Sequence, residues 1–465
     1  MTCKQGAIVG VLVFGMAIGS WSQETPRGPG QSLKYCVVDT GQTRIFSDRG
    51  QLLKVPKPGE PFFGQDAFYR RARPSYRDNG DGTVTNLNTG LTWVQARGSK
   101  VTWNAAVAGA AACRTGGHAD WRMPTIKELY SLVNFEGGFH PEGGSVPYLD
   151  TKYFRFVYGD ESRGERPIDC QDWSATEYVS TTMNGNPTVF GVNFADGRIK
   201  GYPKQRRGPG GATAHKLYVR YVRGNPDYGR NDFRDNGDGT VSDRATGLMW
   251  SKADSKTGMN WEAALAWVQA RNAENYLGHD DWRLPSAKEL QSIVDYSRAP
   301  AVTHSPAIDP VFETTRLPDG EYPYFWSSTT HLDGPADRQG TAAVYVAFGR
   351  ALGWMQFPPG QGERHLLDVH GAGAQRSDPK SGDPAAFSYG RGPQGDVIRI
   401  DNFVRAVRDI DPAAVQLVRP DVKPLPVARG RRQGPPGGPE FGPPAPGFPP
   451  GGRPRPGMRR PPTPL

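Results

Sequence analysis

Residues 76–93 read YRDNGDGTVTNLNTGLTW, and residues 233–250 read FRDNGDGTVSDRATGLMW. The agreement between the two stretches is far beyond chance, so the chain contains an internal repeat. In each stretch the Asn-Gly and Asp-Gly steps supply the positive-φ positions of a tight turn, and the alternation of Thr and Val that follows is typical of a strand. The pattern predicts a β-hairpin or a three-stranded meander at the start of each copy.

Two helices are predicted after each meander. The first is an Ala-rich stretch with apolar residues at helical spacing, Trp103 to Cys113 in one copy and Trp261 to Asn275 in the other. The second begins in the repeated block DWRMPTIKELYSLV at 120–133 and DWRLPSAKELQSIV at 281–294. In both blocks a Thr or Ser after Pro is followed three residues later by Glu, which is the capping box of a helix start.

Later blocks also recur and read as strands that close a sheet: STT at 180–182 and 328–330, and YVRYVRG at 218–224 against NFVRAVRD at 402–409. The fold class predicted from these blocks is α+β, with two tandem modules, each with two helices and an antiparallel sheet. We define module 1 as residues 75–224 and module 2 as residues 232–410. The short linker predicts that the modules pack together.

The spacing between matched blocks grows along the chain, and nearly all the growth lies between Met355 and Asn402. Module 2 therefore contains a long insertion at about residues 356–400. Long loops of this kind inside compact domains are usually functional or disordered. Residues 23–74 form an N-terminal segment that leads into module 1.

The first 22 residues read as a secretory signal peptide. Lys4 precedes an apolar run from Ala7 to Gly19, and small residues follow up to Ser22. The run is shorter than the ~20 residues that a transmembrane helix needs, so we expect cleavage near Ser22, with an uncleaved anchor as the alternative. No later stretch is apolar enough to span a membrane. The protein is expected to be exported to the periplasm, the cell surface or the medium.

The formal charge of +9 is concentrated in the C-terminal region, since residues 420–465 hold eight Lys and Arg against two acidic residues. The rest of the chain is close to neutral, which argues against a nucleic-acid partner. Residues 411–465 are rich in Pro, Gly and Arg without a three-residue Gly period, so they predict a disordered tail and not a collagen helix. Such a tail either holds acidic glycans or cell-wall polymers, or acts as a spacer.

Three cysteines remain after signal cleavage, Cys36, Cys113 and Cys170. An odd number allows at most one internal disulfide, and we expect it between Cys113 and Cys170. No Cys or His spacing typical of a zinc site is present.

The DNGDGT turns offer a calcium interpretation beside the structural one. The candidate ligands are Asp78, Asp81, Asp235 and Asp238. A calcium loop of the EF type places oxygen ligands at positions 1, 3 and 5, but Gly80 and Gly82 fall on positions 3 and 5 here. The spacing therefore favours a structural turn. No other cofactor is predicted.

Two further groups of residues are candidates for ligand binding. Trp282 and Arg283 precede the second helix of module 2, where they either lock a loop to the helix or contact a sugar or sulfate. In the second group, three insertion residues and a histidine at the end of a predicted strand offer metal ligands or polar contacts: Asp368, His370, Arg376 and His331. No spacing among them is diagnostic of catalysis.

The strings GQDAFY at 64–69, DNGDGTVT, TGLMW, DWRLPSAKELQSI and FVRAVRD resemble the Lcl C-terminal-domain family over about residues 33–409. This resemblance implies an exported protein and a fold related to C-type lectins. For the collagen-like adhesin that gives the family its name, it implies binding of sulfated glycosaminoglycans. Family members often carry a Cys in the closing strand, where this chain has Tyr221 and Ala406. The adhesin's collagen-like repeats are also missing.

Three functions follow from these observations. The favoured hypothesis is an exported binding module for acidic or sulfated polysaccharide, in which tandem modules would add avidity. The second is a structural envelope protein without a ligand. The third is an enzyme whose site lies in the insertion of module 2, built on Asp368 and His370.

Overall fold

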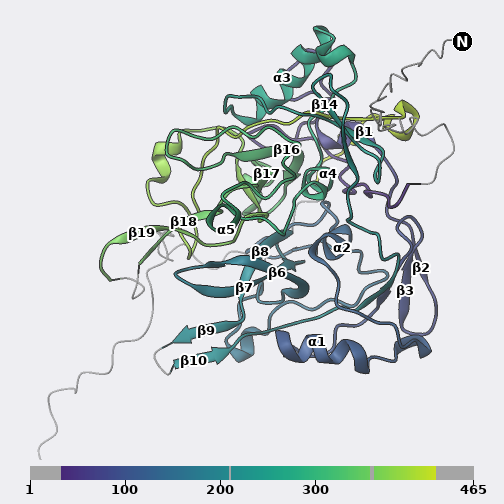
Figure 1. The fold of residues 1–465 in the computed structure, drawn as a ribbon, viewed down its shortest axis with the longest axis vertical. Coiled ribbons are helices and arrows are strands. Elements are labelled where there is room, and N and C mark those ends of the chain that lie inside the picture. Colours follow the sequence, from purple (N-terminus) through teal and green to yellow (C-terminus); the bar gives the residue numbers. More distant parts are fainter. Residues whose placement is uncertain (1–32, 209–210, 357–360, 426–465) are drawn as a thin grey trace, which may run out of the picture.

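The computed structural model describes residues 33–208, 211–356 and 361–425, and in it the two modules lie against each other (Figure 1). The predicted signal peptide at 1–22 and residues 426–465 of the predicted tail lie outside the described residues. Within the described residues, no helix combines the length and apolar character needed to cross a membrane.

Each module begins with the predicted meander. In module 1, β2 (Tyr76–Asp78), β3 (Thr83–Asn86) and β4 (Leu91–Val94) pair antiparallel, and β12 (Val222–Gly224) closes this sheet beside β4. In module 2, the same order is built from β13 (Phe233–Asp235), β14 (Thr240–Asp243), β15 (Leu248–Ser251) and β21 (Val407–Asp409). The glycines of both DNGDGT turns have positive φ. The turn prediction is therefore confirmed.

The two predicted helices are present in each module: α1 (Trp103–Ala112), α2 (Ile126–Ser131), α3 (Trp261–Ala273) and α4 (Ala287–Ser292). Both predicted capping boxes form, with Thr125 and Ser286 as N-caps and the Glu three residues later bonded back to the cap. The described residues of module 2 contain one helix beyond the prediction, the four-residue α5 (Pro300–Thr303).

The largest sheet has six strands and runs through both modules. Its order is β16-β17-β20-β8-β7-β6. Module 1 contributes β6 (Asp172–Thr182), β7 (Asn186–Asn193) and β8 (Arg198–Pro203), and module 2 contributes β16 (Tyr324–His331), β17 (Ala342–Ala347) and β20 (Gln375–Pro379). The modules meet where Gln375 of β20 pairs with Ile199 of β8. The repeat therefore does not yield two separate sheets, because the central strands join.

The insertion of module 2 differs from the long loop that the sequence suggests. Its strand β19 (Arg364–Asp368) forms a hairpin with β18 (Leu352–Gln356), and β20 is the strand that links the modules. Ala372 and Ala374, which precede β20, are buried. Part of the insertion, β20 and the buried residues before it, thus belongs to the six-stranded sheet and the core, whereas β19 forms a separate two-stranded sheet with β18.

Shorter elements complete the fold. Besides the β18–β19 hairpin, the described residues form three further strand pairs outside the main sheets: β1 (Tyr69–Arg70) with β22 (Gln416–Leu417), β5 (Val101–Thr102) with β11 (Lys216–Leu217), and β9 (Gln205–Gly208) with β10 (Gly211–Ala214). Single 3-10 turns are η1 (Asp66–Phe68), η2 (Thr115–Gly117), η3 (Glu161–Arg163), η4 (Tyr276–Gly278), η5 (Ala336–Arg338), η6 (Pro384–Phe387) and η7 (Pro412–Ala414).

One hydrophobic core is shared by both modules. Trp93 and Trp250, which end the repeated block of each meander, are completely buried in it together with Leu129 and Leu290 of α2 and α4. The helices also bond to each other reciprocally: Lys127 Nζ donates to the carbonyl of Ser292 at 2.6 Å, and the equivalent Lys288 Nζ donates to the carbonyl of Ser131 at 2.9 Å. The prediction that the modules pack together is confirmed.

The N-terminal segment crosses module 2, and we call residues 34–72 the strap. Gln42 bonds to the backbone of Thr330 in β16, and Arg71 forms ion pairs with Glu289 and Asp409. The chain beyond 410 also returns to the strap, because β22 pairs with β1 and the amide of Asp421 donates to the carbonyl of Thr43. Residues 411–425 therefore contact the fold, although the sequence places the tail's start at 411.

The expected disulfide between Cys113 and Cys170 is wrong, because all three described cysteines are free. Cys113 ends α1, and its sulfur lies 3.5 Å from the hydroxyl of Thr115. Cys170 precedes β6, is completely buried, and directs its thiol toward the carbonyl of Pro167. The two sulfurs thus have different surroundings, and sequence spacing alone did not reveal this.

Candidate functional site

Trp282 and Arg283 lie in the interior, where they connect a loop to α4. The indole of Trp282 is 1% exposed and donates to the carbonyl of Tyr276 at 2.8 Å. Arg283 forms ion pairs with Glu289 at 2.5 Å and Asp409 at 2.8 Å. Of the two interpretations, this geometry supports the structural one, since neither side chain is accessible to a sugar.

The DNGDGT carboxylates are engaged within their own turns. Asp81 Oδ1 accepts from the amide and hydroxyl of Thr83 at 3.0 and 2.6 Å, and Asp238 Oδ1 accepts in the same way from Thr240 at 2.9 and 2.6 Å. The other two candidates, Asp78 and Asp235, accept from the amides of Gly80 and Gly237. Among the described residues there is no group of three His, Cys, Asp or Glu side chains arranged to hold a metal ion. These contacts account for the motif as a turn.

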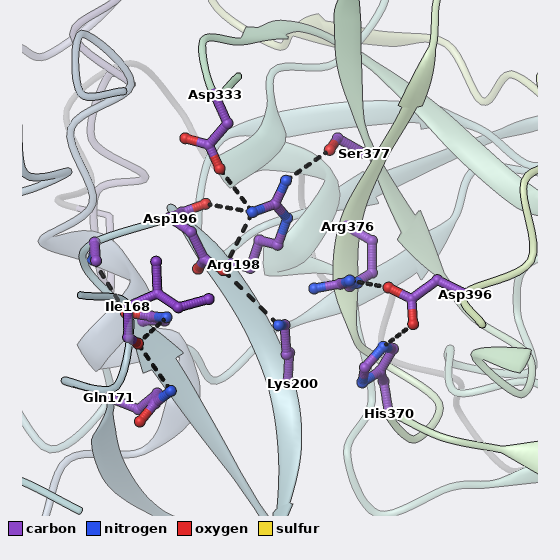
Figure 2. A network of polar contacts seen from close by, with 12 residues as sticks. Ile168, Gln171, Asp196, Arg198, Lys200, Asp333, His370, Arg376, Ser377 and Asp396 are labelled. Carbon is purple, nitrogen blue, oxygen red and sulfur yellow. Dashed lines mark hydrogen bonds and ion pairs between the residues drawn. The ribbon is translucent and has the colours of Figure 1, made fainter. Parts of the chain in front are cut away.

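The structure brings His331, His370 and Arg376 to one place, the seam between β8 and the strands of module 2. Figure 2 shows His370 and Arg376 there, together with groups that the sequence did not single out. We call this set the junction network; it comprises Asp196, Arg198, Lys200, His331, Asp333, His370, Arg376 and Asp396. Asp368 lies nearby but binds a different partner, the hydroxyl of Tyr178 in β6, at 2.7 Å.

In the junction network, the bond of Arg198 to Asp333 crosses from module 1 to module 2, whereas the bonds of Asp396 lie within module 2. Arg198 of β8 donates to Asp333 after β16 at 2.7 Å and pairs with Asp196 at 3.1 Å. The carboxylate of Asp396 bonds to His370 Nε2 at 2.8 Å and also forms an ion pair with Arg376 (Figure 2). The charges therefore compensate one another inside the protein.

Burial dominates the electrostatics of the junction network. It lowers the pKa of His331 to about 4 and the pKa of Lys200 to about 7, with Arg376 adding to the effect on Lys200. Burial alone would raise the pKa of Asp196, but Lys200 and Arg198 hold it below its ordinary value. His331 is therefore neutral at pH 7, and its Nε2 donates to the carbonyl of Asp196 at 2.9 Å.

This arrangement can lock two modules together, but it is poorly suited to bind a large ligand. His331 and His370 are each 1% exposed, so substrate has no access to them in this conformation. The sequence missed Arg198 and its acidic partners because Arg198 and Asp333 are 135 positions apart. The only available signal was the density of charge in ADGRIK at 195–200.

A groove of about 600 Å³ lies between α2 and the segment that follows α4. We call it the module 1 groove. Its wall includes three groups from module 1, two from the linker and one from module 2: Arg122, Thr125, Thr176, Tyr228, Arg230 and Tyr296. The volume falls within the range of ordinary ligand sites, about 300–1,000 Å³.

Module 2 has the same local framework, but the strap covers it. Arg283, Ser286 and Glu289 there correspond to Arg122, Thr125 and Glu128 of module 1. The corresponding cavity of module 2 is lined by Thr40, Asp66 and Arg71 of the strap, and its volume is only about 10 Å³. The side chain of Arg122 is 35% exposed, whereas that of Arg283 is 3% exposed. The repeat therefore provides one open groove and one filled groove.

The family model of the Lcl C-terminal domain matches residues 82–223 and, separately, residues 239–366. One match falls in each copy, the second reaching only to residue 366 of module 2, and together they cover more than half of the chain. No curated protein and no solved structure matches it.

Proposed function

The chain belongs to the Lcl C-terminal domain family, and from that premise we propose that it is an exported binding protein for acidic polysaccharide, with the module 1 groove as its binding site. Each copy supplies the same framework, but only the first is left open to solvent. This asymmetry between a filled and an open groove is the observation that carries the proposal.

The groove wall has the chemistry that an acidic sugar polymer needs. Tyr296 and Phe233 are half-buried and offer aromatic surface on which a sugar ring packs. Arg230 offers a guanidinium group on a side chain that is 72% exposed, whereas the guanidinium of Arg122 is paired with Glu128. Asp295 and Asp309 also line the groove, so its charge is balanced. Binding here would therefore depend on shape and local bonds more than on net charge.

The same proposal includes export to the periplasm, the cell surface or the medium, and a fold related to that of C-type lectins. The apolar run at 7–19 supports the first, and the resemblance of the repeated motifs supports the second. The basic residues between 426 and 465 offer a separate, less selective route to a polyanion. The two routes differ in salt dependence, because diffuse charge is screened far more strongly than a pocket.

The test is binding of heparin and of a polyuronate by the full chain across a salt series. Arg230→Ala should weaken binding about tenfold, since one hydrogen bond to a charged group contributes roughly 1.5 kcal/mol. Arg163→Ala is the matched control: Arg163 and Arg230 are both exposed and both pair with an Asp three residues earlier, but only Arg230 lines the groove. The control should bind like the unaltered protein.

Two results would overturn the proposal. If neither polymer binds at low salt, the hypothesis of a structural protein without a ligand replaces the binding proposal. The repeat would then serve to form the junction network and the shared core. If both variants bind equally well and binding disappears with moderate salt, affinity comes from diffuse charge and the groove is not the site.

A further inference from the structure

The two grooves are equivalent at the level of single hydrogen bonds. The amide of Ile126 donates to the hydroxyl oxygen of Thr176 at 2.9 Å, and the amide of Ala287 donates to that of Thr329 at 2.9 Å. The next contact also repeats: the amide of Ala175 bonds to the carbonyl of Pro124, and the amide of Ser328 bonds to the carbonyl of Pro285. Thr176 and Thr329 therefore occupy the same position in their modules.

In module 2 this threonine binds a carboxyl group. The Thr329 hydroxyl donates to Asp66 Oδ2 at 2.5 Å, and the hydroxyl of Thr40 donates to the same oxygen at 2.7 Å. Asp66 is 5% exposed and belongs to the strap, not to the module. The strap thus fills the groove with an acidic group supplied from outside the repeated unit.

In module 1 the same hydroxyl has no such partner. Thr176 Oγ1 accepts from Ile126, but among the described residues no acceptor receives its proton. The linker at residues 225–231 corresponds to the strap at one contact only. In module 1, Lys127 donates to the carbonyl of Gly229 in the linker, and in module 2 the equivalent Lys288 donates to the carbonyl of Asp39 in the strap. Nothing in the linker corresponds to residues 40–72, and the space that they would fill is the open groove.

From this comparison we propose that the module 1 groove binds a carboxylate at Thr176, in the position that Asp66 takes at Thr329, and that the ligand is a uronic-acid polysaccharide. This inference rests on the proposed function and specifies its ligand. It predicts preference for carboxylated over purely sulfated polymers, because the group in the equivalent position of module 2 is the carboxyl group of Asp66. Arg122 lines the same groove, and its guanidinium forms a bidentate pair with Glu128.

The experiment compares Thr176→Val and Thr176→Ser with the unaltered full chain. The probes are oligogalacturonate, dextran sulfate, neutral dextran and polyglutamate, and affinity is measured by calorimetry. Val keeps the shape of Thr but removes the hydroxyl, so oligogalacturonate should bind about tenfold more weakly, the loss expected for one hydrogen bond to a carboxylate. Ser restores the hydroxyl and should bind within about twofold of the unaltered protein, which separates loss of the bond from a folding defect.

The possible outcomes are distinct. Weaker oligogalacturonate binding by Thr176→Val, with rescue by Ser and little binding of dextran sulfate, supports the carboxylate site. Unchanged binding by Thr176→Val while Arg230→Ala weakens it overturns this inference but leaves the groove as the polysaccharide site. A third outcome is that polyglutamate binds and its binding depends on Thr176, while oligogalacturonate does not bind. This result would support a carboxylate site at Thr176 but would overturn the proposed polysaccharide function. Equal binding of dextran sulfate and oligogalacturonate overturns the preference.

Discussion

Replacing Asp66 with Asn should change how the stability of the protein depends on pH. Burial, with a smaller effect of Asp39, raises the pKa of Asp66 from its ordinary 3.8 to about 7. The folded protein therefore favours the protonated acid, so this group's stabilising contribution is complete below pH 3.8 and is lost as pH rises through about 7. The difference between these two pKa values corresponds to roughly 4 kcal/mol, at about 1.4 kcal/mol per pH unit.

The amide that replaces the carboxyl in Asp66→Asn cannot ionise, and its oxygen can still accept from Thr40 and Thr329. The free energy of unfolding of the variant, relative to the unaltered protein, should therefore increase by about 4 kcal/mol between about pH 4 and pH 8. Urea unfolding followed by tryptophan fluorescence measures the difference at each pH. Asp319→Asn, at an exposed turn, is the control and should show no such trend. Parallel curves for Asp66→Asn and the unaltered protein would refute the reasoning.

Three other predictions follow from the fold. Arg198→Ala should lower the free energy of unfolding by about 3–5 kcal/mol, because it leaves Asp196 and Asp333 buried without their shared partner; a loss below about 1 kcal/mol in a denaturant titration would contradict this. Deleting residues 426–465 should shift Tm by less than about 2 °C, since a Pro- and Gly-rich segment without apolar periodicity buries little surface; calorimetry would detect a larger shift if the segment docks. Maleimide should label Cys113 in the native protein but Cys170 only after unfolding, because Cys170 is buried and burial raises its thiol pKa to about 12; mass spectrometry showing equally rapid native labelling would be inconsistent with the structure.

Local features of the fold could be predicted because they depend on short-range chemistry. The capping boxes at Thr125 and Ser286 and the Asn-Gly and Asp-Gly turns are determined by bonds within a few residues. The repeat also indicated that the copies form similar modules. What it could not indicate was the pairing of β8 with β20, since strand partners far apart in sequence leave no local pattern.

The candidate site was only partly predictable for the same reason. His331, His370 and Arg376 do gather in one network, but Arg198, Lys200 and the acidic groups that neutralise them come from distant segments. The open groove is defined by what covers it, and only the structure shows that the strap fills the second copy and not the first. The sequence match of STT at 180–182 with STT at 328–330 is wrong in register, because it places Thr181 opposite Thr329. The hydrogen bonds of the structure show that Thr176 is the equivalent position.

Hydrogen–deuterium exchange with and without oligogalacturonate tests the central claim most directly, because it reports on both grooves in the unaltered full chain. The proposal predicts slower amide exchange in the wall of the module 1 groove, at residues 122–128 and 226–231, and no change at residues 283–289 of module 2, where the strap already occupies the equivalent position. Slower exchange confined to residues 426–465, or equal protection of both modules away from the groove, would contradict it.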